Sequence, residues 1–138
     1  MEFVQPYGAG IICLMIFVII TLMHGGYVGY QKADAKIKAG SEPDLDYGTV
    51  VYRSHRAHQN AAENMGAITA ALVFAVLAGA SAFWVNWLML AFLILRVVYL
   101  VIYMTGTGKE AQGPRTFAYV ASWAINIAIA VMAMLAVL

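Results

Sequence analysis

The sequence contains few charged residues. Only 11% of its 138 residues are charged, whereas 63% are hydrophobic, and the mean hydropathy is +0.79; typical soluble domains are about half apolar and about one quarter charged. So little charge cannot cover the surface of a soluble domain, whereas a bilayer accepts an apolar surface if helices or a closed barrel satisfy the backbone. We therefore expect an integral membrane protein, with residues 1–138 forming one domain.

Basic residues and cysteine are also scarce. Eight Lys and Arg against seven Asp and Glu give a formal net charge of +1, and phosphate binding needs a clustered cationic face. We therefore expect no nucleic-acid partner. Cys13 is the only cysteine, which excludes an intrachain disulfide. No His, Cys, Asp and Glu have the spacing of metal ligands, so we expect no metal site.

Four long apolar runs predict an all-α fold, an integral membrane four-helix bundle. A hydrocarbon core of about 30 Å requires about 20 helical residues. Runs of suitable length predict spans at about residues 8–30, 52–82, 83–104 and 115–138. The second helix is expected to start near Tyr52 with a polar extension, because no Pro or Gly interrupts residues 52–65. The polar segment 31–51 is predicted to be a loop outside the membrane.

The basic residues are distributed asymmetrically along the chain. All except Arg96 lie in or beside the first and third loops, and the link near residues 79–83 carries no charge. They are Lys32, Lys36, Lys38, Arg53, Arg56, Lys109 and Arg115. By the positive-inside rule these loops are cytoplasmic and both termini lie on the opposite side. The membrane would be a bacterial inner membrane or the endoplasmic reticulum, and a ligand of the basic loop ends would come from the cytoplasm.

A polar stripe is predicted at the start of the second helix. Arg53, Arg56, Asn60 and Glu63 are spaced by three, four and three residues, which places them on one helical face. Small residues suited to close helix packing continue this face. They are Ala67, Ala70 and Ala71. We expect the stripe to point into a bundle rather than toward lipid. The alternative is a surface helix whose charges reach the lipid headgroups, although Asn and Glu side chains are short for this role.

Two other helices carry polar faces as well. Arg96 is an ionisable residue inside an apolar span, for which a functional role is the default, and Tyr99 and Tyr103 follow it on the same face. A structural alternative is an internal ion pair between Arg96 and Glu63, with the tyrosines as interface anchors. The face predicted on the last helix consists of Arg115, Tyr119, Ser122 and Asn126.

These side chains suit a zwitterionic peptide that has two carboxylates. Arginines bind carboxylates in bidentate fashion, Glu63 can hold an ammonium group, and Asn60 and the tyrosines can hydrogen-bond amides or a thiolate. Glutathione is such a molecule, but the spacing alone does not select it over another anionic amphiphile. His55 and His58 are interpreted as surface or interface residues rather than bases, because the helix angle puts His58 opposite Asn60 and Glu63.

Residues 53–64, RSHRAHQNAAEN, resemble a known signature. They are similar to the Arg-x-x-Arg-Ala-x-x-Asn-x-x-Glu motif that opens the second helix of the MAPEG family, the membrane-associated proteins in eicosanoid and glutathione metabolism. Every position is filled, although Tyr52 stands where the family usually has an acidic residue. A second similarity is Arg96-x-x-Tyr99-x-x-x-Tyr103 followed by Arg115, with a somewhat longer loop at 105–114. The resemblance covers the whole chain and is to microsomal glutathione transferases.

The resemblance implies a homotrimer that binds glutathione between neighbouring subunits, near the cytoplasmic face. Arg56, Asn60 and Glu63 would bind the tripeptide, and Tyr99 and Tyr103 would line its site. Arg115 would lie beside the sulfur as the catalytic residue, with Arg53 and Tyr119 as further glutathione-binding residues. The family also uses a basic residue at the end of its first helix, and Lys32 and Gln31 are both candidates for that position.

The function that the resemblance implies is that of a detoxification enzyme, a glutathione transferase with or without peroxidase activity. Its substrates would be lipophilic electrophiles or hydroperoxides that reach it from membrane lipid. Two alternatives belong to other classes. One is a noncatalytic MAPEG-fold binding protein. The other is a small proton-coupled multidrug exporter that uses Glu63 as its membrane carboxylate.

Overall fold

The protein is a bundle of long helices. A computed structural model describes residues 2–107 and 113–138; within them no strand is formed, and four helices are long and apolar enough to cross a membrane. Lys109 and part of the loop at 105–114 lie outside the described residues. The elements are the 3-10 helix η1 (Glu2–Tyr7) and the helices α1 (Gly8–Asp34), α2 (Val50–Leu77), α3 (Ala82–Thr105) and α4 (Pro114–Ala136).

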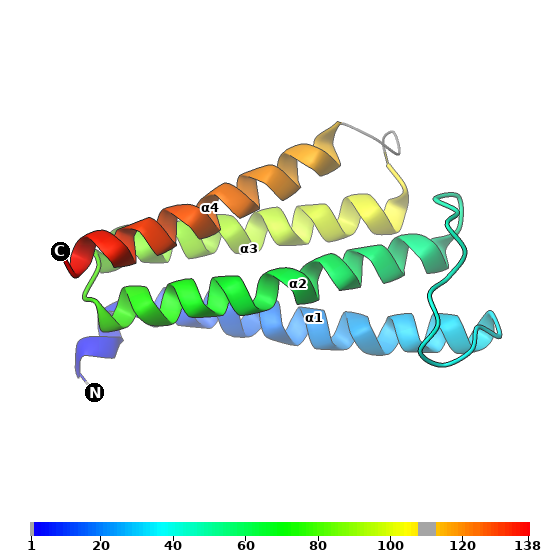
Figure 1. The fold of residues 1–138 in the computed structure, drawn as a ribbon, viewed down its shortest axis with the longest axis horizontal. Helices are drawn as coiled ribbons and strands as arrows, with labels where there is room; N and C mark the ends of the chain where they lie inside the picture. Colours follow the sequence, from blue (N-terminus) through cyan, green and yellow to red (C-terminus); the bar gives the residue numbers. More distant parts are fainter. Residues whose placement is uncertain (1, 108–112) are drawn as a thin grey trace.

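The four helices lie side by side along one long axis (Figure 1). Both termini are at one end, and the segment that joins α1 to α2 is at the other. α2 and α3 contact each other, and each also contacts both α1 and α4. The end of the bundle that carries the α1–α2 segment, the start of α2 and the end of α3 is called the loop end below. The apolar membrane bundle predicted from the sequence is confirmed.

The end of α2 differs from the expectation. The sequence predicts helix to residue 82, but α2 ends at Leu77, because Gly79 adopts a left-handed conformation with φ of +69°. The N–H of Gly79 bonds to the carbonyl of Val76, and that of Ala80 bonds to the carbonyl of Ala75. This pair of bonds is the Schellman motif, which closes a helix at a glycine.

The other helix ends lie closer to their predicted positions. α2 starts at Val50, because the Thr49 hydroxyl accepts a hydrogen bond of 3.4 Å from the Tyr52 N–H, which is a typical N-cap. α1 continues to Asp34, beyond the predicted residue 30. The bounds of α3 and α4 differ from those predicted by at most two residues.

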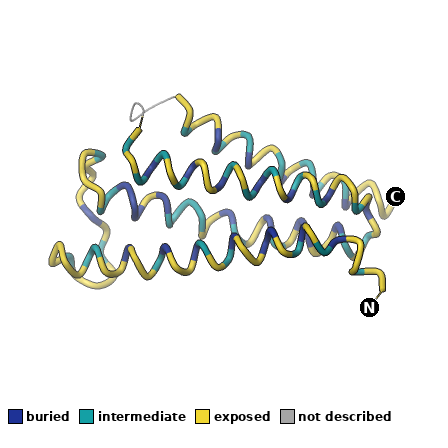
Figure 2. Tube along the Cα trace, turned by 180° about the vertical axis from the view of Figure 1, so that it is seen from behind, coloured by how far each residue is buried: buried dark blue, intermediate teal, exposed yellow. Residues whose placement is uncertain are grey.

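Apolar side chains cover both the inside and the outside of the bundle. Phe17 of α1 and Phe92 of α3 are buried and pack edge to face, with ring centroids 5.2 Å apart. Large apolar side chains such as Leu22, Phe74 and Trp84 are exposed. Figure 2 shows buried positions on the inner sides of the helices and exposed positions on the outer sides. An apolar outer surface is the one that lipid requires.

α1 and α2 approach closely at a glycine. A Cβ atom on Gly25 would lie 2.7 Å from Cε1 of His58. The His24 and His58 rings are 6.0 Å apart, and Nε2 of His24 is 3.0 Å from the Ser54 hydroxyl oxygen. His58 is therefore an interface residue between two helices. The surface interpretation is wrong for His55, which is buried in the single chain.

We predict that Gly25→Ala lowers the free energy of unfolding by about 1–3 kcal/mol, the usual cost of overpacking a filled site. The added methyl group would overlap the His58 ring. Gly26→Ala is the matched control, because a Cβ there meets nothing within 4 Å, and alanine has the higher helix propensity. Unfolding in mixed detergent and SDS micelles measures both variants. Equal effects of the two substitutions on the free energy of unfolding would contradict the close approach of α1 and α2 at Gly25.

Candidate functional site

Four tyrosines gather at the loop end of the bundle. Tyr99 and Tyr103 lie one turn apart on the buried face of α3, with ring centroids 4.9 Å apart. Tyr119 of α4 lies 6.2 Å from Tyr99, and Tyr47 of the α1–α2 segment lies 6.1 Å from Tyr103. Three parts of the chain that are distant in sequence therefore contribute rings to one cluster, which we call the tyrosine cluster.

Arg115 stacks on this cluster. It is in the first turn of α4, where Pro114 starts the helix. Its guanidinium lies 4.8 Å from the ring centroid of Tyr103 and 5.1 Å from that of Tyr47. A guanidinium over an aromatic face is attracted by the negative potential of the ring. The cation at the start of α4 is therefore held opposite the end of α3.

The guanidinium of Arg53 donates hydrogen bonds to backbone carbonyls. Only 9% of its surface is exposed. Its Nε donates to the carbonyl of Tyr103 at 3.0 Å, and its Nη1 donates to the carbonyls of Tyr47 and Gly48, both at 2.8 Å. Arg53 therefore ties the start of α2 to the end of α3 and to the segment before α2. Its predicted role in glutathione binding stays a prediction, and the structure gives it a structural role.

Arg96 is buried deeper in the bundle, between α1 and α3. Only 4% of its surface is exposed, and its guanidinium lies 5.0 Å from the Tyr99 ring and 5.6 Å from the Phe17 ring. Its Nε and Nη1 have no hydrogen-bond partner among the described residues. Glu63 is exposed on α2. The alternative of an internal ion pair between Arg96 and Glu63 is therefore wrong for the single chain.

The first residue of the polar stripe of α2 faces a different side of the helix from the other three. Arg53 points inward, whereas Arg56 and Glu63 are exposed and Asn60 is partly buried. The expectation that the stripe faces the inside of a bundle is therefore wrong for one chain. The reason is that α2 turns its apolar residues, such as Leu72, toward the other helices. Arg56, Asn60 and Glu63 are called the outer stripe below.

The α1–α2 segment covers part of α2 beside the outer stripe. Nη1 of Arg56 donates to Oε1 of Gln59 at 2.8 Å, and Nε2 of Gln59 donates to Oε1 of Glu42 at 3.1 Å. Lys32, a candidate for the family's basic position, donates from Nζ to the Ser41 carbonyl at 2.9 Å. The middle of this segment, at Ser41 and Glu42, is therefore hydrogen-bonded to both of the helices that flank it.

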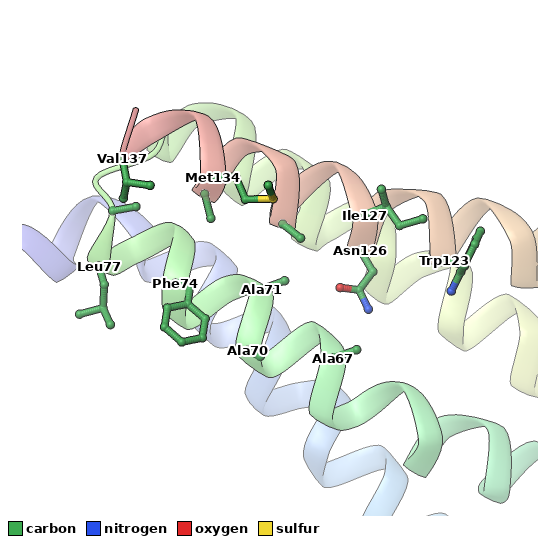
Figure 3. A pocket seen from close by; sticks show the side chains of 13 residues that line it. Ala67, Ala70, Ala71, Phe74, Leu77, Trp123, Asn126, Ile127, Met134 and Val137 are labelled. Atoms are coloured by element: carbon green, nitrogen blue, oxygen red, sulfur yellow. The ribbon is translucent and has the colours of Figure 1, made fainter.

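An apolar groove extends along α2 and α4, beyond the outer stripe. Its volume is about 780 Å³. Ala67, Ala70 and Ala71 line it from α2, and Figure 3 shows Asn126 extending from α4 toward α2. Because Ala67 and Ala70 follow Glu63 at helical spacing, the groove and the outer stripe occupy one continuous face of α2.

The match to known proteins agrees with this architecture. The model of the MAPEG family matches residues 10–135, nearly the whole chain. The chain belongs to the MAPEG family. This family includes glutathione transferases, peroxidases and eicosanoid synthases, and its members use glutathione. No individual curated protein matches the chain.

In this MAPEG chain the predicted site residues fall into two groups. Arg53, Tyr99, Tyr103, Tyr119 and Arg115 belong to or contact the tyrosine cluster. The outer stripe lies on the exposed face of α2 instead. α2 starts at the loop end and α3 ends there (Figure 1), so the outer stripe begins near the tyrosine cluster at Arg56 and extends to Glu63, half-way along α2.

Sequence reasoning missed Tyr47. This residue lies in the polar segment 31–51, outside every helix, so no helical periodicity singles it out. The sequence does contain one indication of its role: an aromatic residue stands directly before Gly48, in a segment that is otherwise rich in charged residues. Its ring contacts Arg53, Tyr103 and Arg115. In the structure Tyr47 is the member of the cluster that joins the α1–α2 segment to α4.

We predict that Arg53→Lys lowers the free energy of unfolding by about 1.5–3 kcal/mol, the contribution of a hydrogen bond to a charged group. An ammonium group keeps the charge but does not reproduce the planar fork that reaches three carbonyls. Arg56→Lys is the matched control, since its exposed guanidinium bonds to a side chain, that of Gln59, and to no backbone carbonyl among the described residues. SDS-induced unfolding should show a smaller loss for the control. Similar losses would show that Arg53 is not the structural tie.

Proposed function

We propose that this MAPEG protein is a glutathione-dependent membrane enzyme, a transferase that also reduces hydroperoxides. The observation that carries the proposal is the position of Arg115, stacked on Tyr103 at the loop end of the bundle, where Arg56 lies in the second turn of α2. A cation and phenol groups are then at the end of the bundle from which a face with an arginine, an amide and a carboxylate begins. The family match supports glutathione as the ligand.

The outer stripe is complementary to a zwitterionic tripeptide. The guanidinium of Arg56 would bind a carboxylate of glutathione, the carboxylate of Glu63 would bind its ammonium group, and Asn60 would hydrogen-bond the peptide. Arg56 and Glu63 are exposed in the single chain and thus accessible to a ligand. Tyr99, Tyr103 and Tyr119 would line the end of the site near the sulfur.

Arg115 would activate the thiol electrostatically. A cysteine thiol has a pKa of about 8.5, and a neighbouring cation lowers it by favouring the thiolate. Tyr103, which lies under Arg115, would donate a hydrogen bond from its hydroxyl to the sulfur. The thiolate would attack an electrophilic carbon, forming a C–S bond as the leaving group departs with the bonding electrons. Each unit by which the thiol pKa falls is about 1.36 kcal/mol of thiolate stabilisation.

The surface of α2 supports a homotrimer. Arg56 and Glu63 are exposed on a membrane-spanning helix, and ionisable residues in such helices face a bundle interior or a water-filled cavity. The groove beyond them is lined in part by alanines, which allow helices to approach closely. A neighbouring copy would cover this face and enclose glutathione between subunits. Lipophilic substrates would then arrive from the membrane, and the loop end would face the cytoplasm.

We predict that Arg115→Ser leaves glutathione binding measurable but raises the pKa of the bound thiol by about one unit, which reduces the thiolate at neutral pH about tenfold. Stopped-flow ultraviolet absorbance detects the thiolate, and calorimetry measures binding. Lys38→Ser is the matched control, because it removes a positive charge from an exposed residue of the α1–α2 segment. Unchanged thiolate formation in Arg115→Ser would remove Arg115 from catalysis.

The same titration of the unmodified protein separates the three functions. Binding with thiolate formation, followed by loss of the thiolate on adding a lipophilic electrophile, is expected for the enzyme. Binding without thiolate would indicate the noncatalytic protein. Absence of binding would favour the exporter, which is less well supported because the MAPEG family model matches residues 10–135.

We predict that Ala70→Trp dissociates the trimer. The large ring would fill the groove where a neighbouring helix is proposed to pack. Ala62→Trp is the matched control: Ala62 is also exposed on α2 but does not line the groove. Native mass spectrometry in detergent gives the subunit number of each variant. A trimer that survives Ala70→Trp unchanged would contradict packing at this groove.

A further inference from the structure

Tyr47 contacts the proposed catalytic cation from outside the helices. Its ring centroid lies 5.1 Å from the guanidinium carbon of Arg115, and the ring centroid of Tyr103 lies 4.8 Å from the same carbon. The two ring centroids are 6.1 Å apart, so the three centres form a compact triangle. The guanidinium therefore lies in the angle between two rings, of which one belongs to α3 and the other to the α1–α2 segment.

This arrangement restricts a side chain that is otherwise long and flexible. An arginine side chain has many rotamers, and stacking on aromatic faces selects among them. Ring contacts do not use up the N–H groups of the guanidinium, because an aromatic face is a weaker acceptor than an anion. Arg115 can therefore be held against both rings and still donate hydrogen bonds to a thiolate. Without Tyr47, the contact on the side of the α1–α2 segment would be lost.

Tyr47 is itself held in place by its neighbours. Nη1 of Arg53 donates to the carbonyls of Tyr47 and Gly48, both at 2.8 Å. The Gly48 N–H donates to Oδ1 of Asp46 at 2.8 Å, and the Thr49 N–H donates to the carbonyl of Asp46 at 3.1 Å. These bonds fix the backbone on both sides of Tyr47, so its ring has a defined position.

The hydroxyl of Tyr47 does not take part in these contacts. Its oxygen exposes less than 1 Å² and has no hydrogen-bond partner among the described residues. Neither glutathione nor a lipophilic substrate can reach an atom that is enclosed in this way. A buried hydroxyl without a partner is unfavourable, so the contacts that Tyr47 makes in the tyrosine cluster are those of its ring.

We propose that Tyr47 is a positioning residue of the enzyme: its ring, acting without its hydroxyl, holds Arg115 where the guanidinium stabilises the glutathione thiolate. This inference rests on the function proposed above. The Coulomb energy falls with the inverse of distance, so a guanidinium that moves to twice its distance from the sulfur loses half of its effect. The position of Arg115 therefore matters as well as its charge.

The test compares the pKa of the bound thiol among variants at saturating glutathione, by the ultraviolet absorbance of the thiolate. Tyr47→Leu should raise this pKa by about half a unit, which reduces the thiolate at neutral pH about threefold. Its dissociation constant at acidic pH, where glutathione binds as the thiol, should stay unchanged. Tyr47→Phe keeps the ring and should keep the pKa, as should the control Tyr30→Leu, since Tyr30 is exposed near the end of α1. An unchanged pKa in Tyr47→Leu, or an equal rise in Tyr47→Phe, would overturn the proposal.

A double variant separates positioning from a general loss of structure. In the Arg115→Ser background, Tyr47→Leu should not change the pKa of the bound thiol further, because the cation that Tyr47 positions is absent. A further rise of the same size would overturn the proposal, since it would show that Tyr47 acts on the thiol by another route.

A series of nearly identical shape covers the case in which Tyr47→Leu does not fold. Phenylalanine with an increasing number of ring fluorines at position 47 weakens the attraction of the ring face for a cation step by step. The pKa of the bound thiol should rise with each step. If the unmodified protein forms a thiolate whose pKa does not respond to fluorination, the role of Tyr47 is overturned and the proposed enzyme stands. If the unmodified protein forms no thiolate, the proposed enzyme is overturned and this inference with it.

Discussion

The hydrogen bonds of Arg53 hold the candidate site together. Its guanidinium joins the carbonyls of Tyr103, Tyr47 and Gly48, and in an apolar surrounding such groups have no water to replace a lost partner. These bonds fix the position of Tyr47, and the rings of Tyr47 and Tyr103 are the two on which Arg115 stacks. The catalytic cation proposed on α4 is therefore positioned by an arginine on α2.

Much of the fold could be predicted from the sequence, because hydropathy over about 20 residues reports directly on the bilayer. Helical periodicity also placed Arg96, Tyr99 and Tyr103 together on one face, and all three are buried. Periodicity could not separate Arg53 from Arg56. Their positions differ by about 60° around the helix, and the boundary between inner and outer faces falls between them. That boundary depends on how α3 packs, which a single helix does not encode.

The polar groups of these helices fall into two classes that differ in what can satisfy them. Arg56 and Glu63 are exposed in one chain, so a neighbouring subunit or a ligand can reach them. The unpartnered nitrogens of Arg96 are enclosed within the chain, where neither a neighbouring subunit nor a ligand can reach them. In the sequence the two classes look the same, because both are charged residues within apolar helices. Whether a ligand or a subunit can reach them depends on tertiary packing.

Arg96 and Arg115 are linked through the rings of the tyrosine cluster. Arg96 lies against Tyr99, Tyr99 lies against Tyr103, and Tyr103 lies under Arg115. In a medium of low dielectric constant, an uncompensated charge on Arg96 would add to the field of Arg115 at a bound thiolate. Arg96 would then both hold Tyr99 in place and add to the stabilisation of the thiolate by Arg115.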